Sequence, residues 1–259
     1  MIDLHVHIIP ALDVGPRDWD EALAMCRAAC EDGTEKLVAT PHMFDGLFNV
    51  KRDDILAGVD ELRSRIQAAG IALEVEPGAD AHLEPDICER IRAGEVVTVA
   101  DAGKYMIVEL SRDVLPPHLS EVLCSVRLLG VTPIISHAER NVEVQNNPSA
   151  LTQLIEGGNL VQVTAASVTG EFGERAHACA HELLTRRMAH VVASDAHSMR
   201  KRPPGLSRAR RVVEEWLSAE EAEDMFVRRP QFILAGERVE LPEIVAPRSP
   251  EKKKRWLFW

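Results

Sequence analysis

The sequence predicts an α/β fold in which a parallel sheet is covered by helices. Short runs rich in Val, Ile and Leu alternate along the chain with longer segments whose apolar residues recur at helical spacing. This alternation is typical of parallel strands joined by helices. The 259 residues are enough for one large domain with a substantial core. A closed or nearly closed barrel fits the pattern as well as an open sheet does.

Seven segments are predicted to be strands. Each is short and bounded by polar or helical sequence, as buried parallel strands usually are. In chain order they are residues 2–7, 36–40, 71–75, 105–110, 132–136, 159–163 and 190–194.

Helices are expected between and after these strands. The segment 53–69 has a buried face formed, at helical spacing, by Ile55, Val59, Leu62 and Ile66. Residues 19–31 show a similar pattern. The remaining helices are expected over residues 85–92, 119–129, 148–156, 172–187, 205–216 and 219–227.

The composition excludes several kinds of protein. The formal net charge of -11 provides no basic excess to displace counterions, so no nucleic-acid partner is expected. The five cysteines form no CxxC pair, and we expect reduced, buried thiols rather than a disulfide framework. The start of the chain has no signal-peptide features, and no stretch reaches transmembrane length. A cytoplasmic location is therefore expected.

Side chains able to bind metal ions stand where nearly every expected strand ends. Because the carboxyl ends of barrel strands share one mouth, these side chains would converge there. They are His5, His7, His42, Asp80, Glu109, His137, Asp195 and His197. The strand over residues 159–163 is the exception, since Thr164 follows it. A lone strand-end histidine is usually structural, but a whole set of donors in one mouth favours a metal site.

The spacing of these residues supports the metal interpretation. His5 and His7 are two residues apart and would point to the same side of a strand. Asp195 and His197 repeat this spacing. Buried imidazoles are costly unless their ring nitrogens have partners, and shared cations would provide them. The donors are nitrogen and oxygen without thiolate, which suits Mn, Fe or Zn.

Adjacent cations are well suited to phosphoester hydrolysis, because they hold a hydroxide nucleophile and neutralise phosphoryl oxygens. Such sites also need arginines to bind those oxygens. Arg140 follows His137 by three residues, and Arg202 follows His197 by five.

A cysteine-nucleophile phosphatase is disfavoured. Such enzymes place Arg six residues after the cysteine. The residues at the corresponding positions here are Asp32, Lys36, Gly94, Gly130 and Thr185. None of them is Arg.

At four motifs the chain resembles a known family. They are Asp-Leu-His-Val-His-Ile-Ile-Pro, Ala-Thr-Pro-His, Ser-His-Ala-Glu-Arg and Ser-Asp-Ala-His with its following Arg-Pro-Pro. These resemble the polymerase-and-histidinol-phosphatase (PHP) superfamily, and within it the bacterial tyrosine-protein phosphatases of capsule and exopolysaccharide biosynthesis. The resemblance implies a distorted (β/α)7 barrel forming a single domain over residues 1–245, with a basic and aromatic tail over residues 246–259.

The resemblance also implies two or three Mn-type ions per chain. One ion would be held by His5, His7, Asp80 and Asp195. A second, bridged by Asp80, would be held by Glu109 and His137. A third would be held by His42 and His197. The phosphate-binding arginines would be Arg140 and Arg202.

Two departures from the family pattern concern this site. The family has Asp-Asp-Gly after the first motif, whereas this chain has Asp13-Val14 followed by Gly. Val14 cannot coordinate, so the third ion would be bound more weakly, held through Asp13 or replaced by water. Asp13 is therefore counted with the two arginines as a candidate catalytic residue. The bridging carboxylate is usually Glu, and Asp80 is one methylene shorter.

The predicted activity is hydrolysis of phosphotyrosine, without a covalent intermediate, on the tyrosine-rich tail of a bacterial autokinase that controls capsule or exopolysaccharide synthesis. A tyrosinate leaving group has a parent pKa of about 10 and needs little general-acid help. One alternative is a small-molecule phosphatase of the histidinol-phosphatase type, which would need a closed pocket. Another is a regulator that binds the phosphopeptide without hydrolysing it. Residues 248–259 could make weak contact with an anionic membrane surface, or act only as a solubilising tail or docking strand.

Overall fold

Short parallel strands form the centre of the protein. The computed structural model describes residues 1–246, and within them the strands pair in two sheets. The smaller sheet contains, in order, β1 (Ile2–Val6), β2 (Lys36–Ala39) and β4 (Glu74–Pro77). The larger sheet contains, in order, β3 (His42–Met43), β5 (Asp80–His82), β6 (Tyr105–Glu109), β7 (Thr132–Ile135), β8 (Leu160–Thr164) and β9 (Val191–Ala193). All neighbouring strands are parallel, as predicted.

The two sheets curl into a nearly closed barrel. The path of β2 continues into β3, and the path of β4 continues into β5, which joins the sheets on one side. On the other side, Val6 of β1 bridges Ala196, which follows β9. The amide of Asp195 donates to the carbonyl of His5 at 2.9 Å, and the amide of His7 donates to the carbonyl of Ala196 at 2.8 Å. The expected distorted barrel is therefore confirmed.

Two strand paths break in the middle, which the sequence did not predict. Pro41, after β2, has no amide hydrogen to continue the ladder. At Gly78, after β4, a Cβ atom would lie 2.5 Å from Cγ1 of Val38 on β2. Glycine therefore allows the close approach of these two paths. The breaks turn the ends of both paths toward the larger sheet.

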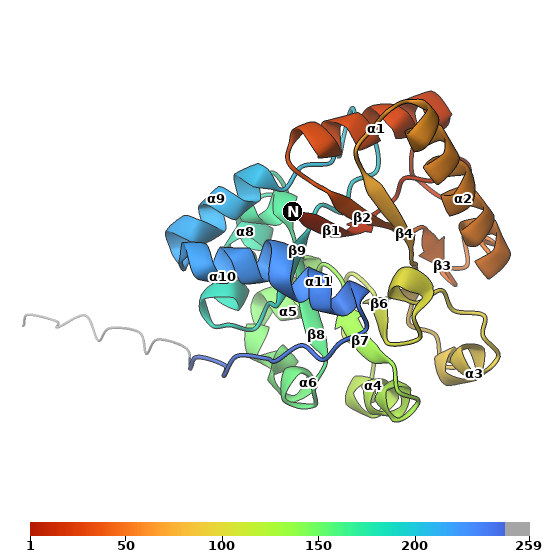
Figure 1. The fold of residues 1–259 in the computed structure, drawn as a ribbon. Coiled ribbons are helices and arrows are strands. Elements are labelled where there is room, and N and C mark those ends of the chain that lie inside the picture. Colours follow the sequence, from red (N-terminus) through yellow and green to blue (C-terminus); the bar gives the residue numbers. More distant parts are fainter. Residues whose placement is uncertain (247–259) are drawn as a thin grey trace, which may run out of the picture.

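Helices connect the strands and surround them (Figure 1). The expected helices correspond to α1 (Trp19–Glu31), α2 (Arg52–Ala68), α3 (Ile87–Arg92), α4 (Leu119–Leu128), α6 (Thr152–Glu156), α8 (Glu174–Thr185), α9 (Ser207–Trp216) and α10 (Ala219–Glu223). Within residues 1–246 the sequence missed α5 (Val142–Asn146), α7 (Ala165–Val168) and α11 (Arg229–Leu234). Short 3-10 turns lie at Val99–Asp101, Ala138–Arg140 and Pro148–Leu151, and a π turn lies at Asp224–Arg228.

The missed helices are four to six residues long, which is too short to show a helical period. None of the helices described combines the length and the apolar character that crossing a bilayer requires.

The buried face of helix α2 was predicted correctly, but the start of the strand that follows it was not. Its buried face is formed by Ile55, Val59, Leu62 and Ile66, as predicted. Beyond the helix, the amide of Ile71 still donates to the carbonyl of Ile66 at 3.1 Å. The strand expected from residue 71 therefore begins only at Glu74.

The core lies between the strands and the surrounding helices. One apolar cluster packs beneath α1 and α2 and includes Met25 and Leu62. A larger cluster packs beneath the other helices and includes Phe226. In Figure 1, α10 and α11 cross in front of the strands. Ile233 of α11 belongs to the same cluster as Ile2 at the start of β1. Helix α11 therefore covers the N-terminal end of the barrel.

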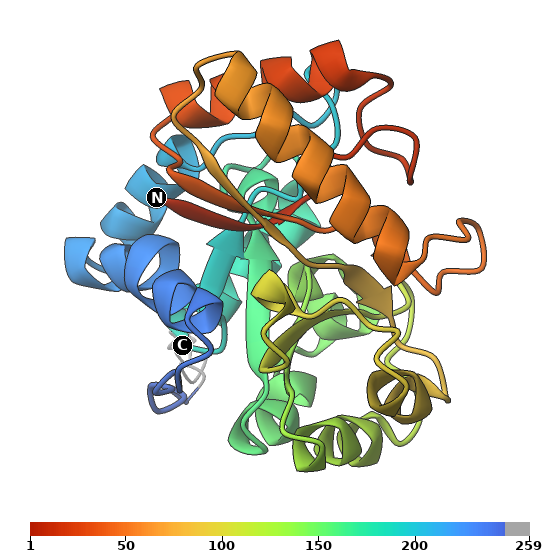
Figure 2. The same ribbon diagram turned by 45° about the vertical axis from the view of Figure 1, so that its right-hand side comes forward.

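The loop before α2, drawn in orange, projects from the body of the molecule in Figure 2.

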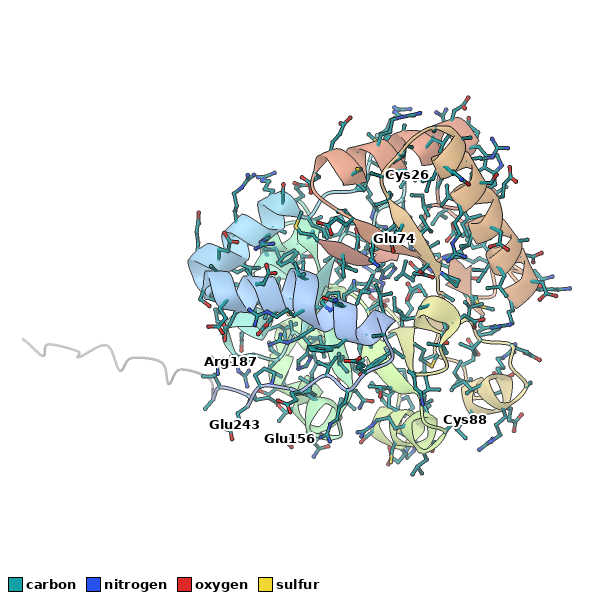
Figure 3. The ribbon with its side chains drawn as sticks, viewed as in Figure 1. Cys26, Glu74, Cys88, Glu156, Arg187 and Glu243 are labelled. Atoms are coloured by element: carbon teal, nitrogen blue, oxygen red, sulfur yellow. The ribbon has the colours of Figure 1, made fainter. Side chains whose placement is uncertain are left out.

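The five cysteines are all free, as expected. Figure 3 shows Cys26 on α1 and Cys88 on α3 at opposite sides of the molecule. Cys26 and Cys179 are buried, but Cys124 is exposed. The expectation of buried thiols is therefore right for only some of them.

Buried His190 links the fold to acid stability. Its Nδ1 accepts a hydrogen bond from the amide of Val161 at 2.9 Å, and its Nε2 has no partner. Burial, together with the nearby guanidinium of Arg229, lowers the pKa of His190 from 6.5 to about 3. The pKa of His190 is lower in the folded than in the unfolded protein. Its contribution to the free energy of unfolding is therefore fully present above pH 6.5 and is lost as the pH falls toward 3.

We expect a His190→Asn variant to lose less stability on acidification than the native protein, because Asn can still accept the amide hydrogen bond but cannot be protonated. At about two pH units below the ordinary histidine pKa, the difference should approach about 3 kcal/mol. Urea unfolding at pH 7 and at about pH 4.5 measures it. An equal loss in both proteins would contradict the assignment.

Candidate metal centre

The eight predicted metal ligands gather at the C-terminal ends of the strands. His5 lies on β1, His42 on β3, Asp80 on β5 and Glu109 on β6. The others come shortly after strands: His7 directly follows β1, His137 comes two residues after β7, and Asp195 and His197 come two and four residues after β9. Their side chains are buried or mostly buried.

Asp80 lies at the centre of this group. Its Oδ2 is 3.5 Å from Nε2 of His5, 3.7 Å from Nδ1 of His42 and 3.6 Å from Nε2 of His137. This oxygen is fully buried and has no hydrogen-bond partner. The other carboxylate oxygen, Oδ1, accepts a hydrogen bond from Oγ of Ser136 at 3.1 Å. Asp80 therefore reaches histidines from three strand paths despite its short side chain, and its bridging role stays a prediction.

A second carboxylate, Asp195, connects the histidines with the arginines. Its Oδ1 lies 3.5 Å from Nε2 of both His5 and His7. Its Oδ2 accepts a hydrogen bond from Arg140 at 2.8 Å and another from Arg202. The two arginines predicted to bind phosphate therefore lie together, beside the predicted metal ligands.

Glu109 completes the set from the side of β6. Its Oε1 lies 3.6 Å from Nε2 of His137, and its Oε2 lies 3.2 Å from Nδ1 of His42. That His42 nitrogen is buried and has no hydrogen-bond partner. His82 also lines this cavity, and its Nδ1 lies 4.0 Å from Oε2 of Glu109.

Protein groups outside the set hold several of the imidazoles in orientation. Nδ1 of His5 pairs with Oε1 of the buried Gln162 at 3.0 Å, and Nδ1 of His7 pairs with Asp13 at 2.5 Å. The Nε2 atoms of these two histidines face each other at 3.1 Å. Metal-binding histidines normally bond their second ring nitrogen to a protein oxygen in this way.

Asp13 has the contacts of a positioning residue. Besides His7, its Oδ2 accepts the amide of His42 at 2.9 Å, and its Oδ1 accepts the amide of Gly15 at 2.9 Å. Val14, the departure from the family pattern, is half exposed and lines the cavity. The catalytic role expected for Asp13 stays a prediction.

Donor atoms in this centre fit divalent cations. Three sets of atoms each lie within 4.8 Å of one another, namely His7 with His42 and His197, His5 with His7 and Asp80, and His42 with Asp80 and Glu109. Two of these donors, on His42 and Asp80, are buried atoms with no hydrogen-bond partner. Such orphaned atoms are costly unless an ion or a proton satisfies them. The Nε2 atom of His197 already has a neighbouring protein group, Nη1 of Arg202 at 3.1 Å.

Charge in the centre favours cations as well. Burial alone would raise the pKa of Asp80, but His5 and His137 outweigh it and hold the pKa well below its usual range. Burial would also raise the pKa of Asp195, but its contacts with the neighbouring histidines and with Arg202 outweigh burial and hold the pKa well below its usual range. Both carboxylates are therefore ionised at neutral pH.

An aromatic side chain supports the two arginines, and the sequence gave no signal for it. The guanidinium carbon of Arg140 lies 4.7 Å from the ring centroid of Phe172, and that of Arg202 lies 5.5 Å from it. Cation–π contacts of this kind limit the freedom of a guanidinium group. Phe172 stands in the loop before α8, where nothing in its sequence neighbourhood distinguishes it.

Glu139, also missed by the sequence, holds the turn that carries His137 and Arg140. It is fully buried, and its Oε1 accepts hydrogen bonds from Oγ of Ser167 at 2.6 Å and from the amide of Thr164 at 3.1 Å. The motif Ser-His-Ala-Glu-Arg thus contains a predicted metal ligand, a buried carboxylate that stabilises the turn, and an arginine predicted to bind phosphate.

A parallel barrel with ionised carboxylates and imidazoles at the C-terminal ends of its strands defines a metal-dependent barrel enzyme. The chain belongs to the family of capsular polysaccharide synthesis proteins CpsB/CapC, whose family model matches residues 1–235.

Named relatives of this chain are tyrosine-protein phosphatases. It is 32% identical over 220 residues to the tyrosine-protein phosphatase YwqE of Bacillus subtilis, covering 85% of this chain and 86% of that one. It is 28% identical over 244 residues to the tyrosine-protein phosphatase CpsB of Streptococcus pneumoniae, covering 92% and 100%. These matches confirm the resemblance drawn from the four motifs.

Solved structures agree with this assignment. A crystal structure from the work on YwqE and CpsB, described as unique metal-dependent tyrosine phosphatases, superposes with a TM-score of 0.91 at 30% identity, covering 95% of this chain and 100% of that one. The phosphotriesterase of Mycobacterium tuberculosis matches with a TM-score of 0.53 at 12% identity, covering 90% and 93%. The second likeness concerns the barrel fold alone.

Proposed function

We propose that this chain is a metal-dependent protein-tyrosine phosphatase. The observation that carries the proposal is the position of Asp195, whose two carboxylate oxygens join the imidazoles of His5 and His7 to the guanidinium groups of Arg140 and Arg202. The predicted cation site and the two arginines predicted to bind phosphate would therefore share one cavity. The activity of the named relatives supports the same conclusion.

Two or three cations per chain would be held by the groups already placed at the mouth. The first would be bound by His5, His7, Asp80 and Asp195. The second would be bound by Asp80, Glu109 and His137. The third would be bound by His42 and His197. The nitrogen and oxygen donors favour Mn, with Fe or Zn as alternatives.

When bound, the cations would act as Lewis acids toward the phosphoryl oxygens and lower the pKa of a water. Side chains of the protein would bind the phosphoryl group and orient the metal ligands. Arg140 and Arg202 would bind the phosphoryl oxygens with their planar guanidinium groups. Asp13 would keep Nε2 of His7 directed into the centre through its contact with Nδ1. A tyrosinate leaving group, with a pKa of about 10, would leave without a dedicated general acid.

The proposed substrate is the phosphotyrosine-bearing tail of a bacterial autokinase that controls capsule or exopolysaccharide synthesis. The capsule-synthesis family supports this choice. A cytoplasmic location, the division into a domain over residues 1–245 and a tail from 246, and the manganese preference also stay proposals. The predicted membrane contact of residues 248–259 lies outside the described residues.

Metal removal tests the proposed function. We expect the purified protein to release phosphate from a phosphotyrosyl peptide, to lose this activity in EDTA and to recover it with added Mn. Phosphate release that persists after exhaustive chelation would contradict a metal-dependent reaction.

Two substrates and one binding assay separate the alternatives. Faster turnover of histidinol phosphate than of the phosphotyrosyl peptide would favour the small-molecule phosphatase. Tight phosphopeptide binding without phosphate release at any added metal would favour the non-catalytic regulator.

Gln162 should influence metal affinity although it is not itself a predicted ligand. Its Oε1 accepts from Nδ1 of His5, which leaves Nε2 free to face Asp80. We expect Gln162→Leu to weaken Mn binding by about 10- to 100-fold, the usual effect of removing such a partner, and Gln162→Glu to restore binding. Calorimetric titration of the metal-free protein with Mn measures this. Equal affinities in the native and Leu proteins would contradict it.

A further inference from the structure

Two cavities lie side by side at the mouth of the barrel. The first, of about 670 Å³, is lined by five of the eight predicted metal ligands and by both arginines predicted to bind phosphate. The second, of about 880 Å³, is formed mainly by residues 43–53, with side chains from the region of α3. Asp45 and Leu47 line both cavities. The second cavity therefore opens beside the first across the tip of the loop before α2.

The tip of this loop has a defined shape. Oδ1 of Asp45 accepts hydrogen bonds from the amides of Leu47 and Phe48, each at 2.9 Å. Gly46 between them has a φ of +74°, a conformation that glycine adopts without strain. The turn leaves the side chain of Leu47 83% exposed. Leu47 therefore forms an apolar ridge between the two cavities, on the loop that projects in orange in Figure 2.

The second cavity combines apolar walls with a charged rim. Phe44 and Phe48 are among its lining residues. The guanidinium of Arg90 lies 4.5 Å from the ring centroid of Phe44 and is held by Asp86 at 2.8 Å. Lys51 at the rim has no ion pair within residues 1–246. Apolar surface surrounded by polar groups is the usual composition of a surface that binds a peptide segment.

We propose that the two cavities form one groove for an extended phosphotyrosyl peptide. The phosphotyrosine would occupy the metal cavity, and a neighbouring residue with an apolar side chain would cross Leu47 into the second cavity. The inference rests on the proposed function and specifies its substrate. The metal cavity alone is already within the size range that holds a whole small ligand. A phosphorylated metabolite would leave the ridge and the second cavity unused, whereas a peptide uses both.

The length and sequence of the substrate test the groove. With Mn added, KM is measured for p-nitrophenyl phosphate, for a phosphotyrosyl tripeptide and for heptapeptides that carry either Leu or Asp on both sides of the phosphotyrosine. We expect the Leu heptapeptide to have a KM about tenfold below that of the tripeptide, equivalent to about 1.4 kcal/mol. The KM of the Asp heptapeptide should lie close to that of the tripeptide.

Variants locate this advantage in the second cavity. Asn49 is exposed and lines only the second cavity, so Asn49→Trp should fill it. We expect this variant to raise KM for the Leu heptapeptide to the tripeptide value, while kcat and the hydrolysis of p-nitrophenyl phosphate stay unchanged. Leu47→Asp, which makes the ridge charged, should raise the same KM. Leu128→Trp is the matched control, because Leu128 is also 83% exposed but ends α4 at the opposite end of the barrel.

The possible failures are distinguishable. Equal KM values for the tripeptide and the Leu heptapeptide in the native protein would overturn the groove. A length advantage that survives both Asn49→Trp and Leu47→Asp would overturn it as well. If the native protein hydrolyses none of the substrates, the proposed function fails instead. In that case the groove is tested by fluorescence anisotropy with the labelled phosphopeptides. The Kd values of the tripeptide and the Leu heptapeptide are then compared in the native protein and in the same variants.

Discussion

Asp195→Asn is expected to lower kcat/KM toward a phosphotyrosyl peptide by at least about a thousandfold, or about 4 kcal/mol of transition-state stabilisation. The side chain serves two groups at once. Its Oδ1 faces Nε2 of His5 and His7, and its Oδ2 accepts from Arg140 and Arg202. An amide keeps the shape but removes the negative charge that cations and guanidinium groups share. Steady-state kinetics at saturating Mn, together with metal content after dialysis, measure the effect.

The control is Asp113→Asn, because Asp113 is an exposed carboxylate on the loop after β6. It should change neither metal content nor kcat/KM. If Asp195→Asn retained most of the native activity and metal, Asp195 would not join the two parts of the site as proposed.

Arg140→Ala and Arg202→Ala are each expected to lower kcat/KM by about 100- to 1,000-fold, because each substitution removes a preorganised hydrogen-bond donor to the phosphoryl oxygens. Arg140 and Arg202 share both Asp195 and the ring of Phe172. The double variant should therefore lose less than the product of the two single effects. Lys should rescue each position only in part, since it supplies the charge without the planar fork.

Arg112→Ala provides the matched comparison. Arg112 lines the same cavity but is exposed and has no ion pair within residues 1–246. Its removal should change the hydrolysis of p-nitrophenyl phosphate by no more than about threefold, as expected for a screened surface charge. Losses as large as those at Arg140 would mean that general positive charge, rather than two specific guanidinium groups, binds the phosphate.

The fold was largely predictable because apolar spacing determines which long segments become helices and which short ones become strands. Helix α1 matches its predicted bounds, residues 19–31, and α2 differs by one residue at each end. The failures have local causes. Pro41 and Gly78 divide two strand paths into short pieces, and β3 is only two residues long. Pieces of that length have no period of their own, and only their pairing in three dimensions makes them strands.

The candidate site was predictable where a residue's position at a strand end implied a shared mouth. All eight predicted metal donors and both arginines meet there. The supporting residues were not predictable. Gln162 comes from β8, the strand without a predicted donor, and Phe172 comes from a loop. A single polar residue inside the apolar run of β8 was the available signal for Gln162, whereas the contact of Phe172 depends on how distant loops pack.

Anomalous diffraction at the manganese absorption edge, from crystals grown with Mn, tests the central claim most directly. The account predicts two or three peaks enclosed by the donors around Asp80 and Asp195, with the first between His5 and His7 and these carboxylates. A map without a peak in that cavity, from protein that hydrolyses phosphotyrosine in the same solution, would contradict it.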